Sequence, residues 1–234
     1  MTLLFEPPPR PAALVDGASA LFPVERIFCV GRNYAAHARE MGSDEREPPF
    51  FFTKFPQSLV SGGGAIPYPP ETGNFHHEAE LVIAIGRAGF AVTAEAAPSL
   101  VYGYAAGLDM TRRDLQLAAR DQGRPWDLGK NFARSAPLGA IRPVEGHGHA
   151  ATGALRLTVN GVVKQEGRIE DMIWSPAEII SHLSRYERLL PGDLIFTGTP
   201  AGVGPVVPGD VLDVTIEGLS ALVVRITEPE AAAP

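Results

Sequence analysis

One short segment, FHHEAELVIAIG (residues 75–86), constrains the fold more than any other part of the chain. Its apolar run LVIAI, followed by a glycine, predicts a strand that is buried on both faces. Because successive side chains of a strand point to opposite faces, Glu78 and Glu80 would share one face. Two buried carboxylates side by side repel each other unless a cation neutralises them, so the segment indicates a cation site. The alternative is a solvent-exposed strand end at which both carboxylates are hydrated.

A third carboxylate, Asp109, follows the segment VYGYAAGL, which predicts another buried strand and contains no charge. Asp109 could instead cap the helix predicted in TRRDLQLAARDQG, although Thr111 is available for that role and forms a capping-box spacing with Asp114. Three carboxylates without a thiolate make a hard site, suited to Mg²⁺, Mn²⁺ or Ca²⁺ rather than to zinc. We therefore expect a divalent cation, with Mg²⁺ as the first candidate.

Four further polar residues could serve a ligand bound beside these carboxylates. Arg113 and Gln116 share one face of the predicted helix, although both could be ordinary solvated residues. Lys130, in GRPWDLGKNF, has apolar and glycine neighbours that fit a cation close to a substrate oxygen, or it could lie on the surface. The segment TGTPAGVG lacks the ending of a phosphate-binding loop, so its Thr199 could contact a carboxylate or simply form part of a turn.

The segment GRNYAAHAREMG predicts a short helix that Asn33 caps and Gly42 ends. His37 and Glu40 are three residues apart on it, a spacing that lets a carboxylate orient an imidazole for proton abstraction. An exposed ion pair would have the same spacing. The polar, proline-broken stretch that follows, GSDEREPPF, predicts a lid that could become ordered over a ligand.

Charge and cysteine content restrict the classes of partner. The formal net charge is −7, which is unsuited to nucleic acid or to an anionic membrane surface, so a small-molecule partner is expected. Cys29 is the only cysteine, which excludes an intramolecular disulfide and suits the reducing cytosol. No signal peptide or membrane span is predicted. We expect a cytoplasmic protein.

The remaining local patterns predict an α+β fold that is mainly β. Asn160 and Gly161 form the pair favoured in a two-residue hairpin turn, here inside LRLTVNGVVKQEG. In SPAEIISHLSRYERLL, Ser175 and Glu178 predict a capping box and one solid helix. We expect a short N-terminal appendage over residues 1–25, one main domain over 26–228 and a frayed tail over 229–234.

Several of these motifs, taken in order, resemble the fumarylacetoacetate hydrolase superfamily, specifically its acylpyruvase and fumarylpyruvate hydrolase branch. The resemblance covers about residues 25–226 and implies a mixed β-sandwich roll with a metal in a pocket at one end of the sheet, usually in a homodimer. It rests on the motifs VGRNYAAHAREMG, HHEAELVIAIG, GLDMTRRDLQ, GRPWDLGKNF, DMIWSPAEII and GDLIFTGTPAGVGP.

The resemblance also implies roles for the candidate residues. Glu78, Glu80 and Asp109 would hold the metal. His37 and Glu40 would act as a catalytic dyad with Lys130 as a third catalytic residue, and the substrate would be bound by Arg113, Gln116 and Thr199.

The implied activity is metal-dependent hydrolysis of a carbon–carbon bond in a 2,4-dioxo acid, an acylpyruvate and in the first place fumarylpyruvate, within aromatic catabolism. Oxaloacetate decarboxylation or keto–enol isomerisation is the alternative in the same superfamily, because the same enolate serves those reactions. An alternative of another class is a non-catalytic β protein that a cation only stabilises.

Overall fold

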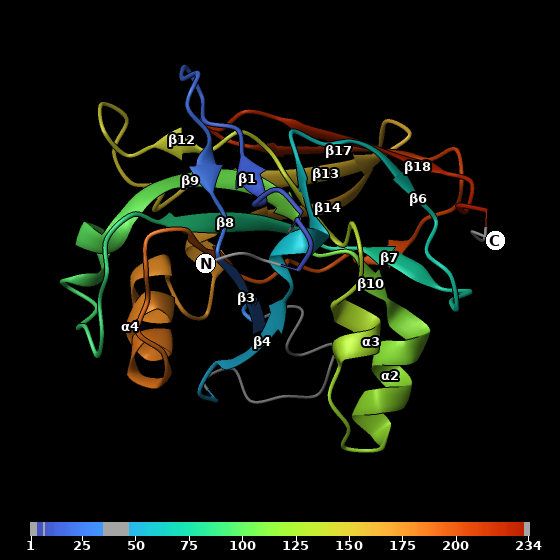
Figure 1. Ribbon diagram of the computed structural model, residues 1–234, viewed down its shortest axis with the longest axis horizontal. Coiled ribbons are helices and arrows are strands. Elements are labelled where there is room, and N and C mark those ends of the chain that lie inside the picture. Colours follow the sequence, from blue (N-terminus) through green and yellow to red (C-terminus); the bar gives the residue numbers. More distant parts are fainter. Residues whose placement is uncertain (1–3, 7, 35–46, 232–234) are drawn as a thin grey trace.

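The computed structural model describes residues 4–6, 8–34 and 47–231, and it is dominated by two curled β-sheets (Figure 1). The larger sheet follows the order β4-β3-β15-β8-β9-β11-β5, with β12 paired to β9 beside this path. Its strands are β3 (Arg26–Gly31), β4 (Phe50–Lys54), β5 (Leu59–Ser61), β8 (Ala79–Ile85), β9 (Val101–Leu108), β11 (Ala136–Leu138), β12 (Arg142–Pro143) and β15 (Asp193–Phe196).

A second sheet lies across β8 and β9 and has the order β14-β13-β17-β18-β6 (Figure 1). Two small sheets have the orders β10-β7-β16 and β1-β2. The strands of these three sheets are β1 (Ala12–Ala13), β2 (Phe22–Pro23), β6 (Gly64–Pro67), β7 (Phe75–His77), β10 (Thr111–Arg112), β13 (Ala154–Val159), β14 (Val162–Arg168), β16 (Gly204–Pro205), β17 (Val211–Ile216) and β18 (Leu222–Thr227).

Helices are few, which confirms the prediction of an α+β, mainly β fold. The helices α2 and α3 lie together at one end of the sheets, and α4 lies at the other (Figure 1). None of the helices in the described part of the chain has the length and apolar character needed to cross a membrane. The helices are α2 (Arg113–Asp121), α3 (Asp127–Lys130) and α4 (Pro176–Tyr186), with short 3₁₀ turns at Pro56–Ser58, Ala97–Leu100 and Ile169–Asp171.

The strand β8 forms the centre of the core, because its side chains are buried on both faces. Leu81 and Ile83 belong to the apolar cluster that fills the space between the two sheets. Val82 and Ala84 belong to a separate cluster on the opposite face, together with Ile27 of β3. The uninterrupted apolar run of this strand is therefore explained by packing on both sides.

Two local predictions are confirmed. Asn160 and Gly161 connect β13 to β14 with φ of 52° and 77°, the left-handed backbone that a two-residue type I′ turn requires at both positions. The helix α4 begins with the predicted capping box, in which Ser175 and Glu178 satisfy each other's backbone N–H groups.

The capping box predicted at the start of α2 was wrong. The helix begins at Arg113 without a side-chain cap, and Thr111 lies instead in β10, paired with His76. The Thr111 hydroxyl donates to the carbonyl oxygen of Asp109 at 3.0 Å. Asp114 accepts hydrogen bonds from the Thr72 hydroxyl at 2.7 Å and from the Gly73 N–H at 2.9 Å, both in the loop before β7. Tertiary contacts thus use both side chains that spacing alone assigned to the cap.

Part of the N-terminal segment packs against the larger sheet. The strand β1 pairs with β2, and Val15 forms an isolated bridge with Ile141. The cluster that contains Val82 and Ala84 of β8 also contains Ala13, Phe22 and Val24. Residues 12–24 therefore contribute to the core of the main domain.

Candidate metal and active site

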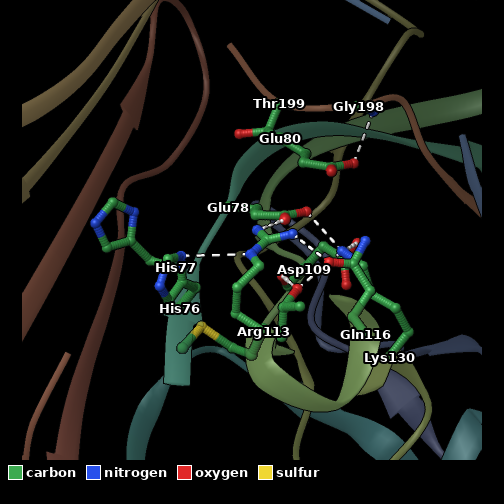
Figure 2. A network of polar contacts seen from close by, with 12 residues as sticks. His76, His77, Glu78, Glu80, Asp109, Arg113, Gln116, Lys130, Gly198 and Thr199 are labelled. Carbon is green, nitrogen blue, oxygen red and sulfur yellow. Dashed lines mark hydrogen bonds and ion pairs between the residues drawn. The ribbon is translucent and has the colours of Figure 1, made fainter. Parts of the chain in front are cut away.

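Three buried carboxylates converge where β8 and β9 meet the small sheet (Figure 2). Glu78 lies between β7 and β8, Glu80 is the second residue of β8, and Asp109 directly follows β9. Antiparallel pairing of β8 with β9 brings them together, and the Asp109 N–H donates to the Glu78 carbonyl at 2.9 Å. One oxygen from each side chain lies within 4.8 Å of the others. The predicted grouping of these three residues is present.

Of the three carboxylates, Glu80 is the one whose negative charge is least offset by neighbouring groups. Its Oε2 accepts a hydrogen bond from the Gly198 N–H at 2.8 Å. Gly198 has φ of 95°, and a Cβ there would lie 2.7 Å from the Cβ of Asn33, so only glycine fits. Burial, followed by the charges of Asp109 and Glu78, raises the pKa of Glu80 well above its ordinary value.

Glu78 is held between two cations (Figure 2). Its Oε1 pairs with Nη2 of Arg113, and its Oε2 accepts a hydrogen bond from Nζ of Lys130 at 2.7 Å. Burial alone would raise the pKa of Glu78, but the charges and hydrogen bonds of Lys130 and Arg113 outweigh it, so the pKa lies below its ordinary value. Glu78 is therefore ionised where Glu80 is driven towards the neutral form.

Lys130 lies at the end of α3 and is buried among oxygens rather than exposed at the surface. Its Nζ donates to Glu78, to Asp109 Oδ2 at 2.6 Å and to the Thr111 hydroxyl at 2.8 Å. Burial lowers the pKa of Lys130, but the charges of Asp109 and Glu78 raise it overall, so the ammonium stays charged. Its neighbour Gly129 packs so closely against α2 that a Cβ there would lie 2.7 Å from the backbone nitrogen of Gln116.

A second lysine, Lys54, was not predicted from the sequence. It ends β4, is only 2% exposed, and its Nζ forms an ion pair with Asp109 Oδ1 at 2.8 Å. The same ammonium donates to the Met110 carbonyl at 3.1 Å, to the Ser135 hydroxyl at 3.0 Å and to the Lys130 carbonyl. Lys54 thus lies behind Asp109 and ties it to the backbone of the other lysine.

The residues predicted to bind substrate lie beside the carboxylates. Arg113 and Gln116 occupy the first turn of α2, and Arg113 Nη1 donates to Gln116 Oε1 at 2.6 Å. The Thr199 hydroxyl donates to the Ala79 carbonyl at 2.8 Å, so within the protein it serves the backbone of β8. Together with Lys130, these three side chains line a cleft that the metal triad also lines.

Apolar and aromatic residues line the same cleft. Its lining includes Phe52, Trp126 and Val30, together with Gly31 and Arg32. The ring centroids of Phe52 and Trp126 lie 5.9 Å apart, and Lys130 Nζ lies 5.2 Å from the centroid of Phe52. The cleft therefore offers a charged end and an aromatic wall to one ligand.

The carboxylates fit a divalent cation. Asp109 Oδ1 is buried without a hydrogen bond from any described residue, although the Lys54 ammonium lies near it. Burial and the charges of Asp109 and Glu78 raise the pKa of Glu80, and a cation at its oxygens would offset them. Carboxylate oxygens are the ligands that Mg²⁺, Mn²⁺ and Ca²⁺ prefer, and within the described part of the chain Asp109 Oδ1 has no hydrogen bond that a metal would have to replace.

The proposed dyad of His37 and Glu40 falls in residues 35–46, outside the described residues, and stays a prediction. The cap predicted at Asn33 also stays a prediction, but the described contacts of its side chain are defined. Its amide donates to the carbonyls of Trp174 at 2.9 Å and Thr197 at 2.8 Å and accepts from the Trp174 N–H at 2.8 Å. Asn33 therefore joins the start of this segment to the loop after β15.

Comparison with known proteins agrees with this geometry. The family model of the fumarylacetoacetate (FAA) hydrolase C-terminal domain matches residues 26–227. A fumarylpyruvate hydrolase of Ralstonia sp is 50% identical over 184 residues, which cover 79% of this chain and 95% of that protein. The mitochondrial oxaloacetate tautomerase FAHD1 of Homo sapiens is 42% identical over 206 residues, which cover 88% of this chain and 93% of that protein.

The fold comparison gives the same result. The crystal structure of fumarylpyruvate hydrolase from Pseudomonas aeruginosa in complex with Mn²⁺ and pyruvate superposes with a TM-score of 0.94 at 49% sequence identity. The match covers 97% of this chain and 100% of that one, so the sheet arrangement is shared throughout. A family model that spans most of the sequence and relatives matched over nearly their whole length lead to one conclusion: this chain belongs to the fumarylacetoacetate hydrolase family.

Proposed function

We propose that this protein is a divalent-metal-dependent hydrolase that cleaves a carbon–carbon bond in a 2,4-dioxo acid. The preferred substrate is an acylpyruvate, in the first place fumarylpyruvate, and the products are pyruvate and a carboxylic acid. The observation that carries the proposal is a single cleft lined both by the carboxylate triad with Lys130 and by the aromatic residues Phe52 and Trp126. A keto acid with an extended unsaturated acyl group would use both sides of this cleft. The similarity to fumarylpyruvate hydrolases supports the same reaction.

In this proposal Glu78, Glu80 and Asp109 hold the cation, with Mg²⁺ preferred over Mn²⁺ or Ca²⁺. When bound there, it would supply Lewis-acid stabilisation of the negative charge that develops on the pyruvate half. A manganese ion accompanies pyruvate in the Pseudomonas aeruginosa relative, which supports divalent metal binding without deciding between the metals.

The chain's own residues would orient the substrate and stabilise charge. Arg113 and Gln116 would bind the keto-acid carboxylate from the first turn of α2, with the backbone of Thr199 opposite them. The Lys130 ammonium would stabilise the oxyanion that forms on the distal carbonyl, because a buried cation acts strongly in a site that excludes water.

The bond change requires only water as co-reactant. The dyad of His37 and Glu40 would take a proton from a water molecule as its oxygen adds to the distal carbonyl carbon. The bond between this carbon and the methylene carbon then breaks. The electron pair passes to the pyruvate half, and protonation of the methylene carbon completes pyruvate while the acyl group leaves as a carboxylic acid.

A second candidate is keto–enol isomerisation of oxaloacetate, or its decarboxylation. The similarity to oxaloacetate tautomerases over 88% of this chain favours it. The polar side of the cleft would suffice for this smaller acid, whereas the aromatic wall favours the longer one. A purely structural metal site would have no need of a cleft lined by Arg113, Gln116 and Lys130. A homodimer, a cytoplasmic location and a place in aromatic catabolism stay predictions.

The test is loss of the ultraviolet absorbance of fumarylpyruvate in the presence of Mg²⁺ or Mn²⁺, with acetylpyruvate and oxaloacetate as parallel substrates. We expect cleavage by the wild type, and its loss in Glu80→Gln and in His37→Ala. If the dioxo acids stay intact while oxaloacetate tautomerises or loses carbon dioxide, the hydrolase proposal fails and the second candidate replaces it.

A further inference from the structure

A buried glutamine in β14, Gln165, lies in the predicted hairpin LRLTVNGVVKQEG, where the sequence assigned it no functional role. It is 1% exposed although most of its strand is exposed. The register between β13 and β14 shifts here, so that Leu157 pairs with Gln165 and Thr158 with Val163. The extra residue of this β-bulge is Lys164. Gln165 shares the less exposed face of β14 with Val163 and Gly167, so its polar side chain points into the core.

The oxygen of Gln165 holds the two residues that flank the metal ligand Glu78. Its Oε1 accepts from the Ala79 N–H at 3.0 Å and lies 3.0 Å from Nδ1 of His77. Because this oxygen can only accept, the His77 ring carries its proton on Nδ1. Two donors fixed on one oxygen restrict the backbone on both sides of Glu78.

The nitrogen of Gln165 holds the loop on the other side of the site. Its Nε2 donates to the Thr199 hydroxyl at 2.7 Å and to the Pro200 carbonyl at 2.9 Å. The Thr199 hydroxyl in turn donates to the Ala79 carbonyl at 2.8 Å. Gln165, Thr199 and Ala79 thus form a closed ring of hydrogen bonds, and all four hydrogen-bonding positions of the amide are used.

The ring has a consequence for ligand binding. The Thr199 hydroxyl donates its single proton to the Ala79 carbonyl, whereas the Thr199 backbone N–H has no hydrogen bond to another described residue. Thr199 lines the cleft, and the adjacent Gly198 N–H binds Glu80. The same loop therefore contacts a metal ligand and lines the cleft, and Gln165 ties this loop to the residues on both sides of Glu78.

We infer that Gln165 is a positioning residue that holds the strand bearing Glu78 and Glu80 against the loop of Gly198 and Thr199. Metal ligands and the Thr199 N–H would then face one bound keto acid. The inference rests on the proposed function, because it concerns the same cleft. A merely structural glutamine would contribute stability and leave ligand affinities unchanged.

The test compares Gln165→Met with Leu157→Ala, which removes buried apolar atoms directly opposite in the same β-ladder. Mn²⁺ is titrated into the full-length, metal-stripped protein by electron paramagnetic resonance. We expect the Mn²⁺ Kd to rise by about 10–100-fold in Gln165→Met, the usual effect of losing a group that orients metal ligands. The Kd should stay at the wild-type value in Leu157→Ala. Equal Mn²⁺ Kd values in the two variants, measured where both are folded, would refute the inference.

A double-mutant cycle with Thr199→Val tests the ring itself. If both residues act through one ring, the KM increase for the keto acid in the double variant is well below the product of the single increases. Effects that multiply would contradict the ring.

If Gln165→Met does not fold, Gln165→Glu takes its place, because it keeps the accepting oxygen and loses both donors. We then expect KM to rise more than the Mn²⁺ Kd, and no change in either would overturn the inference. Because Mn²⁺ binding is measured without substrate, failure to cleave fumarylpyruvate would refute the proposed function alone.

Discussion

At the scale of single residues, the site places cations directly against its carboxylates. Lys54 and Lys130 contact the two oxygens of Asp109 from opposite sides, and only Lys130 lines the cleft. This difference separates their roles: Lys130 can reach a ligand, whereas Lys54 supports Asp109 and the backbone of Lys130 from behind. Replacing one partner of such a buried pair leaves the other with an uncompensated charge.

Lys54→Met should therefore destabilise the metal-free protein by about 3–5 kcal/mol. Added Mn²⁺ should restore part of this loss, because a cation at Asp109 replaces the missing positive charge. Urea unfolding with and without Mn²⁺ measures both effects. The matched control is Lys164→Met, which removes an exposed lysine of β14 and should change the unfolding free energy by less than about 0.5 kcal/mol. Equal losses in the two variants would contradict the role of Lys54.

Glu80 predicts the pH dependence of metal binding. Its pKa is raised by burial and by neighbouring carboxylates, so protons compete with a metal for this oxygen up to an elevated pH. The Mn²⁺ Kd should fall as the pH rises above the ordinary range of a glutamate, with proton release on binding. Calorimetry in buffers of different ionisation enthalpy counts these protons. Glu80→Gln should bind Mn²⁺ weakly and without that proton, and a pH-independent Kd in the wild type would disprove the assignment.

The carboxylates of the site could be predicted from the sequence, but two supporting residues could not. Glu78, Glu80 and Asp109 stand out because each is a charge at the end of an apolar strand. Lys54 ends a strand, a position where a solvent-exposed lysine is common. The chain has only three lysines, and this scarcity could have drawn attention to Lys54 as a functional candidate. Gln165 lies on the less exposed face of β14 between Val163 and Gly167, and a polar residue in a mostly exposed strand gives no local signal that it is buried.

At the scale of elements, the loop after β15 has a glycine that geometry requires. Gly198 and Gly209 have nearly the same backbone, with φ of 95° and 97°, but only Gly198 has a neighbour that a Cβ would strike. Gly209→Ala should lose about 1–3 kcal/mol from backbone strain alone. Gly198→Ala should lose more and should also weaken Mn²⁺ binding, because its N–H orients Glu80. Urea unfolding and Mn²⁺ titration of both variants separate backbone strain from displacement of the N–H that binds Glu80. Equal stability losses and equal Mn²⁺ Kd values in the two variants would contradict the role of Gly198.

Elements with local signals were predictable, and their assembly was not. The turn at Asn160 and Gly161 and the capping box of Ser175 depend on neighbouring residues, and both are confirmed. The insertion of β15 between β3 and β8, parallel to one and antiparallel to the other, joins segments far apart in the chain. The resemblance to a family implied a mixed β-sandwich roll but no strand order, and the family is confirmed.

At the scale of the whole molecule, a metal would join parts of the chain that fold from separate segments. Because these ligands meet only in the folded protein, metal binding must stabilise it. At a free Mn²⁺ concentration of 100 times Kd, the unfolding free energy should rise by about 2.7 kcal/mol, and excess chelator should remove the gain. Thermal unfolding with Mn²⁺ or with chelator tests this. The same increase in Glu80→Gln would mean that the ion binds elsewhere.

The matched charges around the triad also govern how two ligands influence each other. Two of the three carboxylates, Glu78 and Asp109, are in contact with three basic side chains, so a divalent ion leaves the pocket with excess positive charge that an anionic keto acid offsets. Each ligand then improves the other's affinity by the same factor, as thermodynamic reciprocity requires. Metal and acid would behave as cooperative partners, and the pocket would hold the ion most tightly when there is substrate to turn over.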